Sequence, residues 1–159
     1  MGNLTPRNLA LRALNRFDVE GSIPQYHLEQ IFSRYLEVSA KDKALAVHLT
    51  NGVLRWRRRL DWIVEQYVSF PFQKIEPDIL NILRIALYQL FFMDRIPEFA
   101  AVNEAVDQAK FSGRPHLARF VNGILRQVIR EKDEIAFPRK GDDPIRYYSV
   151  MYSYPEWLV

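Results

Sequence analysis

The stretch Phe120-Val-Asn-Gly-Ile-Leu-Arg-Gln-Val-Ile-Arg130 decides the fold class, because it reads as a helix with two opposite faces. At about 100° per residue, one face is an apolar stripe that contains Leu117, Val121, Ile124, Leu125 and Val128. The opposite face contains Arg119, Gly123, Arg126 and Arg130. The apolar stripe requires a protein core. The basic face either keeps the helix soluble or receives a phosphate-bearing ligand, which a glycine does not obstruct.

Composition indicates one ordinary globular domain. The chain has 159 residues, of which 48% are hydrophobic and 26% are charged, and its net charge is only +3. The placement of charge therefore matters more than its total. The sequence contains no cysteine, which excludes disulfides, thiolate metal sites and a cysteine nucleophile within it. No apolar run approaches the ~20 residues needed to span a bilayer, so a cytoplasmic location is expected.

Prolines, glycines and capping residues divide most of the chain into helical segments. Thr5-Pro6 begins the first helix, which Gly21 ends. Further helices are predicted over residues 25–36, 39–57, 60–68, 78–93, 98–111 and 115–130. The segment 78–93 is apolar on more than one side, which indicates a central position. The sequence predicts an all-α fold, a globular bundle of about seven helices.

The pattern changes after the last of these helices. Pro138, Gly141 and Pro144 are typical of a linker, and the residues from Ile145 to Val159 are rich in aromatic side chains. We therefore expect a helical domain over residues 1–131 and a linker or connecting segment over residues 132–159.

Arginines are the candidate functional residues. The sequence predicts no catalytic site and no metal site, since the three histidines are isolated and lack ligand spacing. Arginine grips phosphates with two hydrogen bonds and stacks on unpaired bases, which suits structured RNA. The candidates lie on three predicted helices or directly after one of them: Arg12, Arg16, Arg55, Arg57, Arg58, Arg59, Arg119, Arg126 and Arg130. A protein-protein surface is the alternative, because arginine is also enriched at interfaces.

Four segments resemble the NusB superfamily of RNA-binding helical domains. They are Pro97-Glu-Phe-Ala-Ala-Val-Asn-Glu-Ala-Val106, Phe120-Val-Asn-Gly-Ile-Leu-Arg126, Gly52-Val-Leu-Arg55 and Leu83-Arg-Ile-Ala-Leu-Tyr-Gln-Leu90. The resemblance covers most of the chain from Pro6 to Arg130. It implies a bundle of helices in two packed groups, with RNA contacts through the basic N-terminal helix and neighbouring surfaces.

Two kinds of protein carry such a domain: free-standing NusB antitermination factors and the Sun/RsmB family of ribosomal-RNA cytosine-5 methyltransferases. The second kind is favoured by Arg55-Trp-Arg-Arg-Arg-Leu-Asp-Trp62, Phe91-Phe-Met-Asp-Arg-Ile-Pro97 and the arginine that ends Gly123-Ile-Leu-Arg126. The segment Tyr152-Ser-Tyr-Pro-Glu-Trp-Leu-Val159 resembles the one that leads into the methyltransferase domain. In that domain the family places its catalytic thiolates and S-adenosylmethionine, within a separate α/β fold.

The resemblance thus implies a non-catalytic N-terminal domain that binds small-subunit ribosomal RNA and positions it for a methyltransferase domain. The chain is expected to be a fragment of a longer protein or one part of a split protein. Tyr152, Tyr154 and Trp157 are expected to contact the C-terminal methyltransferase domain. No membrane or DNA partner is expected. A free-standing antitermination factor that recognises a single-stranded RNA, or a domain that only docks other proteins, remains the alternative.

Overall fold

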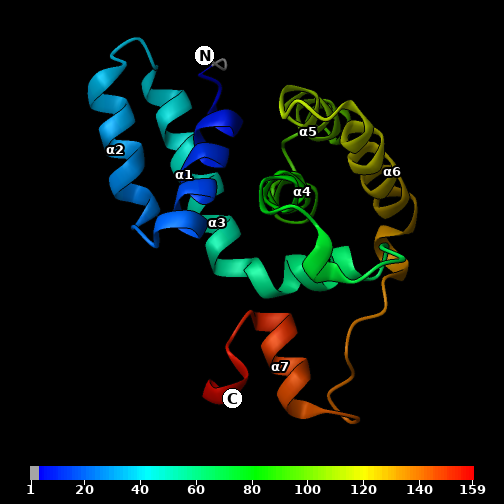
Figure 1. Ribbon diagram of the computed structural model, residues 1–159. Coiled ribbons are helices and arrows are strands. Elements are labelled where there is room, and N and C mark those ends of the chain that lie inside the picture. The colour runs from blue at the N-terminus through cyan, green and yellow to red at the C-terminus, as the bar shows by residue number, and fades with distance from the viewer. Residues whose placement is uncertain (1–3) are drawn as a thin grey trace.

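The computed structural model describes residues 4–159, which contain seven α-helices and no strand. The expected domain starts at residue 1, so its first three residues lie outside the described part. The all-α prediction is confirmed (Figure 1). The helices are α1 (Pro6–Glu20), α2 (Pro24–Arg34), α3 (Ala40–Glu65), α4 (Pro77–Phe92), α5 (Glu98–Phe111), α6 (Pro115–Glu131) and α7 (Pro144–Tyr152). Short 3-10 turns lie at Phe72–Lys74, Lys132–Glu134 and Glu156–Leu158.

Local sequence sets the helix ends. The Thr5 hydroxyl accepts a hydrogen bond from the Asn8 N–H at 3.2 Å, and Ser39 accepts one from Asp42 at 3.1 Å. Both side chains satisfy N–H groups that the first helical turn leaves free. Gly21 ends α1 with a φ of 68°, a left-handed conformation that favours glycine.

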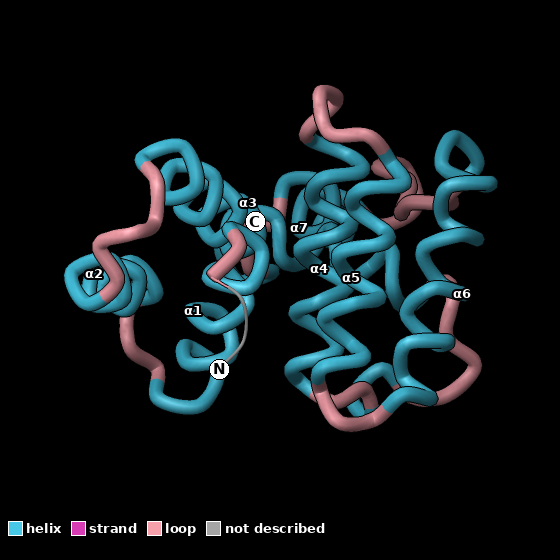
Figure 2. The backbone as a smooth tube through the Cα atoms, turned by 90° about the horizontal axis from the view of Figure 1, so that it is seen from above, coloured by secondary structure: helices cyan, strands magenta, loops and turns pink. Residues whose placement is uncertain are grey.

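The helices form two packed groups, as expected. In Figures 1 and 2, α1, α2 and the first part of α3 lie on one side, and α4, α5 and α6 lie on the other. Leu9, Ala13, Leu28, Val38 and Ala46 form a small core in the first group. A larger core extends from α3 across α4 to α5 and α6.

Helix α4 is central, because every residue from Ile79 to Leu90 is buried. It approaches α3 closely at Gly52. A Cβ built on that glycine would lie 2.1 Å from Cζ of Tyr88, which is too close for any real contact. The Tyr88 hydroxyl lies 2.9 Å from His48 Nε2, so the ring is fixed across the contact between the two helices.

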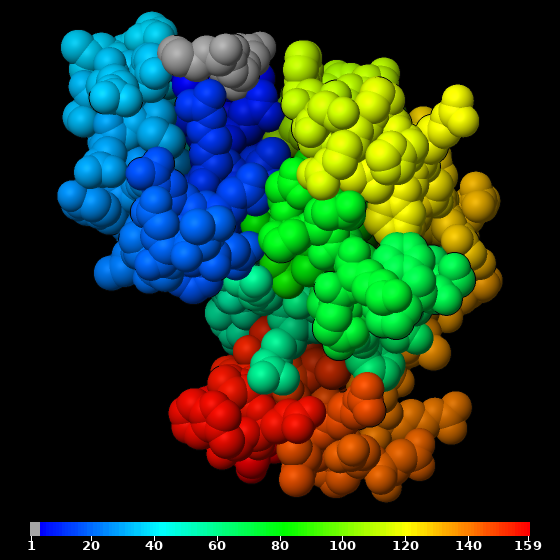
Figure 3. All heavy atoms as spheres, viewed as in Figure 1, coloured from blue at the N-terminus to red at the C-terminus, as the bar shows by residue number. Residues whose placement is uncertain are grey.

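Two elements differ from the sequence prediction. Residues 39–57 and 60–68 were predicted as two helices, whereas α3 is one helix with a kink at Trp56, whose φ and ψ are −108° and 17°. The segment 132–159, expected as a linker or connecting segment, contains α7, a helix that was not predicted and that packs on α3. In Figure 3 this segment, coloured orange and red, forms the lower end of the molecule. Among residues 4–159, no helix is long and apolar enough to cross a bilayer.

Candidate nucleic-acid interface

The structure separates the nine candidate arginines into three surfaces. One set lies beside the kink of α3, where α7 packs. Another lines a groove between α1 and α2. The third follows the exposed side of α6. The sequence alone did not predict this separation, because it depends on how the helices pack.

The arginine run of α3, which consists of residue 55 and residues 57–59, binds the C-terminal segment. Arg55 Nη1 donates to the backbone oxygen of Tyr152 at 2.7 Å, and Arg58 Nη1 donates to Ser149 Oγ at 3.1 Å. The backbone N–H of Arg59 donates to Ser153 Oγ at 3.1 Å. A kink interrupts the hydrogen bonds of a helix, so the serine supplies an acceptor in the turn after Trp56.

Arg59 is enclosed by aromatic rings as well. Its guanidinium carbon lies 5.5 Å from the centroid of the Phe92 ring and 5.3 Å from that of Phe137, which are cation–π distances. Burial disfavours the charged form and lowers the pKa of Arg59 from its ordinary value. This arginine is therefore a structural residue between the main bundle and the C-terminal segment.

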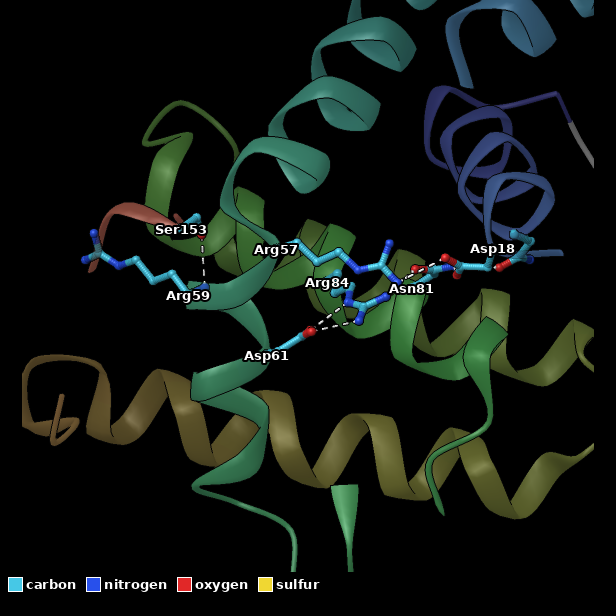
Figure 4. A network of polar contacts seen from close by, with 8 residues as sticks. Asp18, Arg57, Arg59, Asp61, Asn81, Arg84 and Ser153 are labelled. Atoms are coloured by element: carbon cyan, nitrogen blue, oxygen red, sulfur yellow. Dashed lines mark hydrogen bonds and ion pairs between the residues drawn. The ribbon is translucent and has the colours of Figure 1, made fainter. Parts of the chain in front are cut away.

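Arg57 belongs to a polar network that joins α1, α3 and α4 (Figure 4). Its Nη2 lies 3.0 Å from Asp18 Oδ1, and Asp18 Oδ2 accepts from Asn81 Nδ2 at 2.8 Å. Asn81 Oδ1 accepts from Arg84 Nη1 at 2.9 Å. Arg84 donates to both oxygens of Asp61, at 2.6 and 2.8 Å.

Arg84 is a structural residue that the sequence reasoning missed. It is only 3% exposed and lies in the middle of the buried helix α4. A signal was available, because a charge within an apolar run that is buried on all sides requires a partner. The partner itself, Asp61, was not predictable, since it comes from a different helix.

The groove between α1 and α2 has a volume of about 1090 Å³ and contains two predicted arginines, Arg12 and Arg16. Arg34 of α2, which the sequence reasoning did not select, adds a third cation to the same groove. Arg16 Nε lies 3.1 Å from Glu20 Oε1, but both side chains are about half exposed. Such a pair contributes little to stability, so the arginine can exchange this carboxylate for a phosphate at small cost.

The groove also offers surfaces for bases. Tyr35 and His27 line it, although His27 is only 7% exposed, and the exposed ring of Tyr26 lies on the same helix, α2, outside the groove lining. Aromatic and histidine rings are the usual stacking partners of unpaired RNA bases. The groove therefore combines cations with the ring of Tyr35, a combination that suits single-stranded or looped RNA.

The α6 surface is the most regular of the three. Arg119, Arg126 and Arg130 are exposed, and the buried residues of the helix, among them Val121 and Leu125, lie on its opposite side. A Cβ on Gly123 would meet nothing within 4 Å, so the middle of this face is open. The two-faced helix read from the sequence is confirmed, while the RNA role of its arginines stays a prediction.

The three predicted contact residues at the C-terminal end expose aromatic area. Tyr152 and Tyr154 are each 43% exposed and stack on one another, with ring centroids 6.4 Å apart. Trp157 is 84% exposed. Side chains of this kind mark interaction sites when they gather on one surface.

Within residues 4–159, no three His, Asp or Glu side chains gather in a way that could hold a metal ion. The same residues form no sheet.

Comparisons with known proteins agree with this architecture. Residues 4–130 match the model of the NusB family. The whole chain aligns at 33% identity with the probable ribosomal RNA small subunit methyltransferase B of Bacillus subtilis, and this alignment covers 35% of that protein. The chain thus spans about a third of the length of this curated relative.

Solved structures show the same fold. T. maritima NusB is 26% identical, with a TM-score of 0.70 over 79% of this chain and 89% of that chain. The complex of the antitermination factors NusB and NusE with dsRNA contains a chain that is 22% identical. Its TM-score is 0.71, over 79% of this chain and 93% of that chain.

Proposed function

Because the chain belongs to the NusB family, we propose that it is the RNA-binding domain of a small-subunit ribosomal RNA cytosine-5 methyltransferase. The groove between α1 and α2 carries this proposal, since it gathers Arg12, Arg16 and Arg34 beside the ring of Tyr35, which can stack on a base. The domain adds phosphate contacts and orients the RNA, while another domain extracts and modifies a cytosine.

The C-terminal segment favours a methyltransferase over a free-standing NusB factor. The NusB family match ends at residue 130, whereas the alignment with the Bacillus subtilis methyltransferase covers the whole chain, residues 131–159 included. Residues 144–152 form α7, which Arg55 and Arg58 fasten to the bundle. A domain that must hold RNA at a fixed place relative to a catalytic domain needs such a rigid connection.

The exposed aromatic residues supply the docking surface. Under this proposal Tyr152, Tyr154 and Trp157 contact the methyltransferase domain, which covers their apolar area. S-adenosylmethionine and the catalytic thiolates belong to that domain, and small-subunit ribosomal RNA is the shared substrate. The present residues contribute binding and orientation alone.

A charge-removal experiment tests the RNA assignment of the groove. The double variant Arg12→Gln and Arg16→Gln is compared with the unaltered chain for binding to fragments of small-subunit ribosomal RNA across a range of salt concentrations. Each lost phosphate contact lowers the salt slope by roughly 0.7 to 1 unit, so we expect a flatter slope and weaker binding. Arg95→Gln with Arg139→Gln removes the same charge from exposed positions outside the groove and serves as the control.

An equal loss in both double variants would mean that only net charge matters, and the groove assignment would then be wrong. The second candidate function is a free-standing NusB-type factor, which the similarity to T. maritima NusB favours. Selective binding of a linear RNA that depends on a ribosomal protein partner would support that candidate instead.

A further inference from the structure

The exposed face of α6 is a second concentration of positive charge. The helix contains Arg119, Arg126 and Arg130, and no acidic residue occurs from Pro115 to Arg130. None of the three arginines makes a hydrogen bond or an ion pair with residues 4–159. By contrast, the arginines of the α3 run are held by Tyr152, Ser149 and Asp18.

Helical geometry places these cations in a straight row. At 100° per residue, Arg126 and Arg130 lie within about 20° of the direction of Arg119, and Gly123 lies within about 40° of it. Eleven residues at about 1.5 Å each put the first and last arginine roughly 16 Å apart along the axis. The missing side chain of Gly123 leaves room for a backbone to approach between them.

The α6 face and the α1–α2 groove lie at opposite ends of the main bundle. Figures 1 and 2, which differ by a quarter turn, both show α2 at one end and α6 at the other, with α4 between them. The chain of packed helices runs from α2 through α1 and α4 to α6. With neighbouring axes about 8–10 Å apart, the two outer helices are separated by on the order of 25 Å.

We infer that the α6 face is a second RNA-binding site, so that one chain holds two separate RNA segments at once. This inference rests on the proposed function and extends it. The site takes a phosphate backbone, because it offers three unpaired guanidinium groups around an open glycine and no acidic side chain. A folded ribosomal RNA with two neighbouring helical arms supplies both segments.

RNA fits this face better than a protein partner does. The exposed row consists of arginines, Gly123 and Asn122, with no large apolar side chain among them. Protein interfaces are centred on buried aromatic or aliphatic anchors, which the row lacks. The C-terminal surface around Trp157 has such anchors, so the two surfaces differ in chemistry.

The test measures how many RNA molecules one chain binds. The probe is a short RNA hairpin, made with a donor dye in one preparation and an acceptor dye in another. Mixed with the unaltered chain at low salt, the two should show energy transfer, and native mass spectrometry should show two hairpins per chain. The triple variant Arg119→Gln, Arg126→Gln and Arg130→Gln should bind one hairpin and lose the transfer. The double variant Arg12→Gln and Arg16→Gln should also bind one hairpin and lose the transfer, because it removes the groove site.

The outcomes separate this inference from the proposed function. One hairpin per unaltered chain, or an α6 triple variant that still binds two, overturns the second site and leaves the groove intact. Loss of binding in the α6 variant alone, with no effect of the groove variant, overturns the groove assignment. No RNA binding by the unaltered chain overturns both. Arg95→Gln with Arg139→Gln should keep two hairpins, and circular dichroism checks that each variant is folded.

Discussion

Gly52 is the residue at which the packing of α3 on α4 leaves least room. The Cβ of an alanine there would lie 2.1 Å from Cζ of Tyr88. The ring of Tyr88 is buried, and its hydroxyl is hydrogen-bonded to His48. We expect Gly52→Ala to lower the free energy of unfolding by about 1–3 kcal/mol through overpacking, measured by urea denaturation. Gly123→Ala is the matched control, since its methyl group meets nothing within 4 Å. It should raise stability by about 0.5–1 kcal/mol, because alanine favours a helix interior.

Asp61 is the partner of the buried guanidinium of Arg84. Asp61→Asn removes the negative charge and leaves Arg84, 3% exposed, without its bidentate carboxylate. We expect a loss of about 2–4 kcal/mol in the free energy of unfolding, because an uncompensated buried charge is costly. Glu20→Gln removes the exposed pair with Arg16 and should change stability by less than about 0.5 kcal/mol. Similar losses in both variants would contradict the structural role of the network.

Tyr67 makes the free energy of unfolding depend on pH in the alkaline range. Burial, followed by hydrogen bonding to the Glu131 carboxylate, raises the pKa of Tyr67 to about 12 from an ordinary value of 10.0. The unfolded chain therefore releases this proton first, and stability present below pH 10 is lost as the pH rises toward 12. Tyr67→Phe should reduce that loss in denaturation curves measured across this range. An unchanged pH dependence would show that the phenol does not titrate as described.

At the scale of elements, α7 is fastened to α3 by arginine side chains. Arg55→Gln with Arg58→Gln removes the hydrogen bonds to Tyr152 and Ser149. We expect the amides of residues 144–152 to exchange with deuterium several-fold faster, while α4 stays protected, because local opening costs less than global unfolding. RNA binding should weaken less than in the Arg12 and Arg16 variant. The reverse order would assign the larger share of RNA binding to Arg55 and Arg58.

The elements show what sequence can predict and where it stops. Helix α6 was predictable, because its apolar and basic stripes both repeat at helical spacing. Helix α3 was predicted as two helices, since nothing local indicates that the chain continues through a kink at Trp56. Packing of α7 against that kink supplies the contacts that hold the turn together.

The positions and contacts of the arginine side chains were less predictable than the helices that carry them. Spacing placed Arg55 and Arg58 on a face, but it did not show that both would hydrogen-bond to the C-terminal segment while staying exposed. The groove of Arg12, Arg16 and Arg34 likewise depends on how α1 packs against α2. The packing of segments that are distant in the sequence decides which arginine side chains remain free to bind a ligand. A periodic sequence pattern shows only which residues share one face of a helix.

At the scale of the whole molecule, three surfaces point in different directions. The α1–α2 groove and the α6 face lie at opposite ends of the bundle, and the aromatic C-terminal segment lies beyond α3 (Figures 1 and 3). The polar network from Asp18 to Asp61 connects α1, α3 and α4 through hydrogen bonds between their side chains. Under the proposed function, this arrangement would hold RNA in a defined orientation relative to whatever the C-terminal segment contacts.

Crosslink mapping tests the RNA-binding account most directly. The unaltered chain is bound to small-subunit ribosomal RNA, irradiated, digested, and analysed by mass spectrometry for peptides that carry nucleotides. We expect crosslinked peptides from α1 and α2 around Arg12, Arg16 and Arg34, and from α6 around Arg119 and Arg126. Crosslinks confined to α7 and the α3 arginine run, with none in the groove or on α6, would contradict the account.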